Sequence, residues 1–468
     1  MNAFIIKLGR GPQILWLFCG LCVLLFSACR PSEKQVEEIY QRGVQDWQAG
    51  ARQVAIQEFT KVIELDPKFT QAYLARAVAR FTLKDFAGAI SDCNAVIGLD
   101  PDNERAFVIK GASKSYLGDL NGAKNDLSTA ISLSSDDPLA YKCRGLVLAQ
   151  MRDWDGAQTN LTKTIELNPN DAESYRSRGA VEMMLKDYEK GIADASDAIE
   201  LDSVNAADAY RLRALGEANL KNRTNAFADV KQAIELKPSE PHVYLTSAMI
   251  EILWDDYSDA SNDLQTAFQL SPTNTEVYLC RGLLDEKCGD FNAAITELNQ
   301  GLASHLDTLH APEIYEALGF AEENLYQWRS ALETFHKGLA FKSPPDDMRF
   351  EVFLLECRLG QTNEAQTELA EYIRSIPAAK AGDWKASVAQ FLAGKLTETQ
   401  LISRATTTAK RATDIPKQLC EAYYYAAMKC LLAGDKAGAV TRFQKSLGTK
   451  EDNSYQFLNA RSQLQALN

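Results

Sequence analysis

The sequence has few of the residues and motifs on which catalytic and metal sites are usually built. Histidine occurs only at His242, His305, His310 and His336, and never with the i, i+4 spacing and glutamate of a helical zinc motif. A GxSxG elbow, a phosphate-binding GxxxxGK loop and a Rossmann glycine pattern are all absent. We therefore expect no metal site, no cofactor and no catalytic activity.

Positive charge is also in short supply. Lysine and arginine total 50 against 63 aspartates and glutamates, which gives a formal net charge of -13. The basic residues are spread one or two per expected helix among carboxylates, whereas binding to a phosphate backbone requires a clustered basic stripe. This distribution excludes nucleic acid from the expected partners.

One apolar run stands out near the N-terminus. It extends from Ile14 to Phe26, 13 residues, and follows Lys7 and Arg10. A helix needs roughly 20 apolar residues to span the hydrocarbon core of a membrane. The pattern therefore favours a secretory signal over residues 1–28, cleaved after export, and leaves a permanent transmembrane anchor as the alternative.

The end of this segment, Phe26-Ser27-Ala28-Cys29, resembles a bacterial lipobox, although Phe26 stands where leucine is usual. The resemblance implies cleavage before Cys29 and acylation of Cys29, with enough acyl chain for stable anchoring. Residues 29–35 would then form a tether. By the same resemblance, aspartate directly after the cysteine would imply retention in the inner membrane, and this sequence has Arg30 there. The expected location is therefore extracytoplasmic, as a membrane-anchored lipoprotein, on the outer membrane and facing the periplasm if the organism is a diderm bacterium.

The cysteines that follow Cys29 do not suggest a disulfide framework. They are seven in number, none forms a CxxC, and an odd number excludes complete internal pairing. Their positions fall within the expected helices, so we interpret them as buried apolar thiols, with at least one free.

The rest of the chain is built from one repeating unit. Small residues recur at steps of 34 or 35 residues, with one step of 37, at Ala55, Ala89, Ala123, Ala157, Gly191, Ala226, Ala260, Ala294, Ala331 and Ala365. A large apolar residue precedes most of them at a fixed distance, as Tyr73 precedes Ala89, and a second small residue follows one helical turn after each large one. Large side chains facing small ones at helical spacing are typical of two closely packed antiparallel helices. Each repeat is therefore predicted to be a helical hairpin.

Segments such as Tyr175-Arg176-Ser177-Arg178-Gly179 and Asp187-Tyr188-Glu189-Lys190-Gly191-Ile192 resemble the tetratricopeptide-repeat (TPR) consensus. The resemblance implies an all-α fold, a right-handed α-α superhelix (TPR solenoid) of about eleven helical hairpins. Residues 36–375 would form an array of about ten repeats, residues 376–419 an irregular helical linker, and residues 420–468 a final TPR and a capping helix.

A charged pair recurs in these repeats at one fixed offset. The pairs are Arg42 with Glu58, Arg76 with Asp92, Lys110 with Asp126, Arg178 with Asp194, Arg213 with Asp229 and Arg281 with Glu297; Arg144 stands opposite Asn160. A ligand-binding charge ladder is one interpretation. We favour an ion pair between the two helices of each repeat, which fixes their register.

In a TPR superhelix the first helix of each repeat lines the concave groove, and the residues expected there are mostly apolar. The groove candidates are Leu74, Val78, Phe81, Leu146, Leu245, Met249, Ile252, Leu279 and Leu283. The sequence also allows several of them to pack against the neighbouring repeat. The Lys and Asn clamp of chaperone-binding TPR domains is not reproduced, so an apolar or amphipathic segment of another protein is the expected ligand.

These features favour a non-enzymatic protein-binding adaptor or assembly scaffold at the bacterial cell envelope. The alternative is a glycan-binding lipoprotein similar to the SusD-type nutrient receptors. In such a receptor, exposed aromatics in residues 377–419, Trp384 among them, would form the sugar site.

Overall fold

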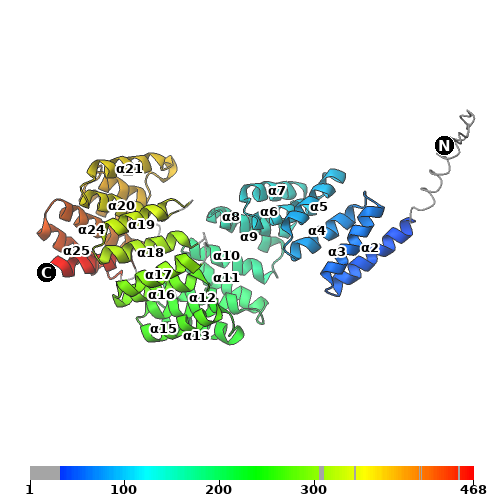
Figure 1. Cartoon of the computed structure of the whole chain (residues 1–468), viewed down its shortest axis with the longest axis horizontal. Helices are drawn as coiled ribbons and strands as arrows, with labels where there is room; N and C mark the ends of the chain where they lie inside the picture. The colour runs from blue at the N-terminus through cyan, green and yellow to red at the C-terminus, as the bar shows by residue number, and fades with distance from the viewer. Residues whose placement is uncertain are drawn as a thin grey trace, which may run out of the picture. The chain divides into compact units, whose positions relative to one another are not determined.

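The computed structural model describes residues 32–304, 310–341, 344–409, 412, 414–451 and 454–467. The predicted signal segment, Cys29 and His305 lie outside the described residues. Within them the chain forms 25 α-helices and one short 3-10 helix, with consecutive helices packed as antiparallel pairs (Figure 1). The prediction of an all-helical, TPR-like repeat fold is therefore confirmed. No described helix is long and apolar enough to cross a membrane.

The chain divides into two compact units, of which the first ends at Ser203 and the second begins at Val204. The boundary falls where one repeat step lengthens from 34 to 35 residues. The first unit contains five hairpins. They are α2 (Glu33–Gln48) with α3 (Arg52–Leu65), α4 (Thr70–Thr82) with α5 (Phe86–Leu99), α6 (Glu104–Tyr116) with α7 (Leu120–Leu133), α8 (Pro138–Gln150) with α9 (Trp154–Leu167), and α10 (Ala172–Met184) with α11 (Tyr188–Leu201).

The second unit begins with five further hairpins of the same kind. They are α12 (Ala207–Asn219) with α13 (Arg223–Leu236), α14 (Pro241–Leu253) with α15 (Tyr257–Leu270), α16 (Thr275–Cys288) with α17 (Phe291–Ser304), α18 (Ala311–Asn324) with α19 (Trp328–Leu339), and α20 (Asp346–Arg358) with α21 (Thr362–Ser375).

The second unit ends in a less regular region. A 3-10 turn (Ala378–Lys380) precedes the two short helices α22 (Trp384–Leu392) and α23 (Glu398–Thr407). One more hairpin, α24 (Asp414–Leu432) with α25 (Lys436–Gly448), is followed by α26 (Tyr455–Leu467). The largest core cluster of the described residues lies here and joins α20 and α21 to α22–α26.

Close approach within each hairpin depends on the small residues of the repeat. Gly111 on α6 faces Leu127 on α7, and a Cβ atom added at Gly111 would lie 2.7 Å from Leu127 Cγ. The small residue on the second helix, Ala123, is fully buried. The pattern of large side chains against small ones thus sets the distance between the two helix backbones.

The hairpin turns use a left-handed residue followed by an N-cap. Gly118 adopts φ 83° and precedes Asp119, whose carboxylate accepts a hydrogen bond from the Gly122 N–H at 2.9 Å. Lys84 occupies the equivalent left-handed position with φ 63°. A side chain there costs roughly 1–2 kcal/mol, a cost that glycine avoids and that the chain nevertheless bears at Lys84.

The six predicted charged pairs are all ion pairs between the two helices of one hairpin. Three are short, with Arg76–Asp92, Arg178–Asp194 and Arg213–Asp229 each at 2.7 Å. The remaining three, Arg42–Glu58, Lys110–Asp126 and Arg281–Glu297, lie between 3.4 and 3.6 Å. Arg144 Nε donates to Asn160 Oδ1 at 2.8 Å. The pairs join helices of the same repeat, which confirms the structural interpretation of the ladder.

Helix α26 reaches back to a hairpin far upstream in the sequence. Tyr455 stacks on Phe320 of α18 with ring centroids 4.3 Å apart, and Asn324 Nδ2 donates to Asn459 Oδ1 at 2.6 Å. Helix α26 therefore covers the first helices of earlier repeats as well as the final hairpin, the face on which a groove is expected.

Candidate functional site

The first unit carries an apolar cleft on the face formed by its first helices. We call it the first cleft; its volume is about 560 Å³. Its lining residues come from α4, α6 and α8 and are Val78, Phe81, Glu104, Arg105, Val108, Ile109, Ala112, Asp137, Leu139 and Cys143. The repeats are in register, so the first helices α4, α6 and α8 present the same face. Side chains from that face of each helix therefore meet in one cleft.

The polar end of the first cleft is acidic. Burial raises the pKa of the Glu104 carboxyl to about 7, and a hydrogen bond to Asp137 and the charge of Asp137 act in the same direction. Arg105 is the one basic side chain that lines this cleft. At the apolar end, the ring of Phe81 meets the ring of Tyr116 edge-on with centroids 5.6 Å apart. Tyr116 is 66% exposed, so this end presents aromatic surface to solvent.

The second unit has a similar cleft, the second cleft, with a volume of about 440 Å³. Its walls are the first helices α12, α14 and α16, and helix α26 contributes Tyr455 and Leu458. The apolar wall includes Leu215, Ile252 and Leu283, and Met249 in this wall is 45% exposed. Glu286 and Lys287 are the charged residues in the lining.

The structure places five of the nine predicted groove residues in these clefts. Val78 and Phe81 line the first cleft, and Met249, Ile252 and Leu283 line the second.

The remaining predicted residues lie elsewhere. Leu74 and Leu279 are half-buried against core clusters, and Leu146 is half-buried on α8. Leu245 requires a correction, because its side chain is 1% exposed and packs with Ala248 and Leu264 in a core cluster. Its position faces the second helix of its own hairpin, so it is not available to a partner.

Several lining residues were not predicted. Leu139 is 50% exposed in the first cleft and follows directly after the N1 proline of α8, outside the repeat positions of the expected groove residues. Tyr455 and Leu458 come from α26, which follows the last hairpin. A contact between α26 and helices so far upstream leaves no local signal in the sequence.

Trp384, the aromatic residue considered for a sugar site, is buried. Its side chain is 8% exposed and lies in the large core cluster, and its Nε1 donates to Glu421 Oε2 at 2.6 Å. Stacking on a sugar ring requires an exposed aromatic face, so Trp384 cannot serve that role in this structure.

The comparisons with known proteins agree with the repeat pattern. The tetratricopeptide repeat family model matches residues 40–104 and 144–206. No curated protein matches the sequence.

The chain is also similar to several solved structures. A tetratricopeptide repeat protein from Parabacteroides merdae is 16% identical, with a TM-score of 0.48 over 54% of this chain and 98% of that one. Pseudomonas aeruginosa pilF is 20% identical, with a TM-score of 0.40 over 44% and 93% of the two chains. YrrB, described as a TPR protein with an unusual peptide-binding site, is 22% identical, with a TM-score of 0.33 over 38% and 92%.

Both the matched segments and the helical hairpins repeat the same helix–turn–helix unit, with small residues at its crossing point and, in six hairpins, an ion pair across it. Repeats of this kind are generally non-catalytic. Residues 40–104 and 144–206 therefore belong to tetratricopeptide repeats, and the other hairpins of the array have the same form.

Proposed function

We propose that this chain is a non-enzymatic scaffold that binds apolar or amphipathic segments of other proteins in its two clefts. The observation that carries the proposal is the exposure of large apolar side chains on the first helices, where Leu139 is 50% and Met249 45% exposed in the cleft walls. Exposed apolar side chains that converge on one concave site cost free energy in water, and a partner that covers them recovers it.

The form of the clefts supports a helical or extended peptide as the ligand. Each cleft is bounded by three consecutive first helices, and its volume lies within the range of about 300–1,000 Å³ that is usual for binding pockets. Apolar side chains spaced at i, i+3 and i+4 on a partner helix would contact successive repeats, as in other helix-in-groove complexes. The first cleft, with acidic groups at one end, favours a partner segment that carries a basic residue there.

The proposal includes a location at the bacterial cell envelope. Its support is the sequence pattern of residues 1–29, where a signal-like segment ends in Phe26-Ser27-Ala28-Cys29. An acylated Cys29 would hold the scaffold at the membrane and present both clefts to extracytoplasmic partners. Membrane fractionation and acyl labelling of the chain and of Cys29→Ser test this step. Retention of Cys29→Ser in the membrane with unchanged labelling would contradict a lipid on Cys29.

Partner binding is tested by affinity capture from solubilised envelope, with quantitative comparison between matched variants. Met249→Glu places a charge in the second cleft, and Met184→Glu is its control, because Met184 is 58% exposed on α10 and lines neither cleft. In the same way, Leu139→Glu is compared with Leu117→Glu, where Leu117 is 56% exposed outside the first cleft.

We expect at least one partner to be retained by the control variant and lost by the corresponding cleft variant, with circular dichroism showing that all four remain folded. Equal capture by the cleft and control variants would place the binding surface elsewhere and refute the proposed role of the clefts.

A further inference from the structure

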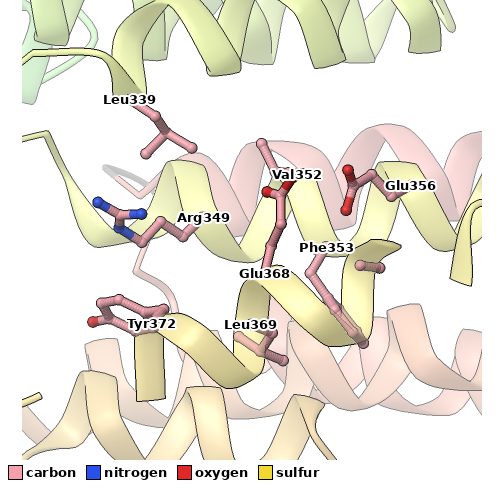
Figure 2. Close-up of a pocket in the computed structure, with 9 residues that line it drawn as sticks. Leu339, Arg349, Val352, Phe353, Glu356, Glu368, Leu369 and Tyr372 are labelled. Atoms are coloured by element: carbon pink, nitrogen blue, oxygen red, sulfur yellow. The ribbon is translucent and has the colours of Figure 1, made fainter. Parts of the chain in front are cut away.

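Three potential metal ligands meet on consecutive helices of the second unit. His336 lies on α19, Glu356 on α20 and Glu368 on α21, and one ligand atom from each lies within 4.8 Å of the other two. His336 Nε2 is 3.9 Å from Glu356 Oε1. Glu356 and Glu368 both line the pocket drawn in Figure 2, together with Arg349 and Tyr372. The site thus joins two adjacent TPR hairpins, and it is separate from both clefts.

Glu356 has a buried carboxylate oxygen without a partner. The residue is 5% exposed, and among the described residues Oε2 has no hydrogen-bond partner although it is shielded from solvent. Leaving a buried acceptor unsatisfied costs about 1–3 kcal/mol, and more when the group is charged. The carboxylates of Glu368 and Glu364 add negative charge beside Glu356. Among the described residues, His336 is the only basic group that the ion pairs place against Glu356.

The nearby guanidinium groups do not balance the negative charge of these carboxylates. Arg349 lies over the ring of Tyr372, with its Cζ 5.2 Å from the ring centroid, and Arg358 lies over the ring of Trp328 at 4.2 Å. Neither forms an ion pair with Glu356 or Glu368 within the described part of the chain. Both guanidinium groups lie on aromatic faces, and neither is paired with the two carboxylates.

We propose that His336 Nε2 and the carboxylates of Glu356 and Glu368 bind one divalent transition-metal ion, with Zn²⁺ as the preferred occupant. One imidazole and two carboxylates match the ligand types of zinc, and water would complete a four-coordinate shell. Calcium and magnesium are disfavoured, because they take six or more oxygen ligands and do not select imidazole.

The distances allow this with small side-chain movements. Ligand atoms bound to one tetrahedral ion at about 2.1 Å lie about 3.4 Å apart. The His336–Glu356 distance of 3.9 Å exceeds this by about 0.5 Å, and the other two distances, which are within 4.8 Å, exceed it by at most about 1.4 Å. His336 and Glu368 are exposed, so rotation about their side-chain torsions can shorten these distances, while the buried Glu356 provides the fixed point.

Metal binding at this site would link the hairpin α18–α19 to the hairpin α20–α21. The interface between them contains α19 and α20, which pack Phe335 against Met348 and Val352 in one core cluster. An ion held by α19, α20 and α21 would add a cross-link at the edge of that cluster. We therefore expect the ion to stabilise the second unit locally.

The test is titration of the metal-stripped full chain with Zn²⁺ in competition with a chromophoric chelator, and with Co²⁺ as a spectroscopic probe. We expect one binding site per chain, and we expect the visible absorption bands of bound Co²⁺ to have the intensity typical of a four-coordinate ion. Loss of an outer-shell group weakens metal binding about 10- to 100-fold. His336→Asn and Glu368→Gln should weaken Zn²⁺ binding by more than this, because each removes a direct ligand.

Glu364→Gln is the matched control, because Glu364 lies on the same helix one turn earlier, is exposed, and adds the same charge near Glu356 without contributing a ligand atom. His242→Asn is a second control for surface imidazoles, since His242 Nδ1 lies 3.3 Å from Glu276. Both variants should keep the affinity of the parent chain. Absence of binding, equal weakening by Glu364→Gln and Glu368→Gln, or unchanged binding by His336→Asn would each overturn the assignment.

Discussion

The ion pairs occupy the same position in each repeat but differ in burial. We therefore predict that buried pairs contribute more to the free energy of unfolding than exposed ones. Asp92 is 2% exposed and accepts hydrogen bonds from Arg76 Nε at 3.0 Å, from Arg76 Nη2 at 2.7 Å and from Arg80 Nη1 at 2.8 Å. The equivalent Glu58 accepts a long bond, of 3.5 Å, from Arg42, whose side chain is 62% exposed, and a second bond from the exposed Lys61.

Asp92→Asn removes the negative charge between two guanidinium groups and keeps the side-chain shape. Hydrogen bonds to charged groups contribute about 1.5–3 kcal/mol, and breaking a buried ion pair by removing one partner costs about 3–5 kcal/mol. Because asparagine still accepts one bond, as Asn160 does from Arg144, we expect a loss of about 2–3 kcal/mol. Glu58→Gln, in contrast, should cost less than about 1 kcal/mol, because water already solvates Arg42.

The assay is native-state amide hydrogen exchange of the full chain, read on peptides from α4 and α5, because repeat arrays open locally and a single unfolding midpoint would average over many repeats. A loss of about 2–3 kcal/mol corresponds to about 30- to 140-fold faster exchange at about 1.4 kcal/mol per tenfold. High salt should reduce the effect of Glu58→Gln more than that of Asp92→Asn. Equal acceleration of exchange by the two substitutions would refute the argument that burial determines how much each ion pair stabilises the fold.

Three further predictions concern packing, pH and thiol reactivity. Gly111→Ala should destabilise the first unit by about 1–3 kcal/mol because the new methyl group meets Leu127, whereas Gly98→Ala, with open space around it, should be neutral or stabilising by up to about 1 kcal/mol in denaturant unfolding. Burial raises the pKa of the fully buried Glu351 well above its ordinary value, so the folded state keeps a proton that the unfolded state releases, and stability should fall as pH rises above about 4.5. Glu351→Gln should flatten this decline in melting temperature between pH 5 and pH 8, and an unchanged slope would contradict the role of Glu351. Maleimide should label the exposed Cys288 in the native chain well before the buried Cys280, whose pKa burial raises to about 12; simultaneous labelling would contradict the burial assigned to Cys280.

Much of the fold of a repeat protein can be predicted from its sequence, because contacts within one hairpin join residues at a fixed separation along the chain. The pairing of Arg76 with Asp92 and that of Gly111 with Leu127 both follow from the same sequence offset, which is set by two helices and their turn. The hairpins of the array and their crossing points were therefore predictable, and so were the groove residues Val78, Phe81 and Met249, which occupy the inner face of first helices.

The tertiary structure alone decided which side chains of that face are covered and which potential metal ligands meet between repeats. Leu245 and Met249 are one helical turn apart, yet Leu245 is buried in its hairpin and Met249 lies open in the cleft, because a small rotation of the helix separates core from surface. Helix α26 folds back onto α18, and His336, Glu356 and Glu368 come together from three helices at unequal spacings along the chain. No local periodicity encodes these contacts, since they depend on how consecutive hairpins rotate against one another. The sequence by itself thus determined the repeating unit and its register, and packing between consecutive hairpins determined the clefts and brought His336, Glu356 and Glu368 together.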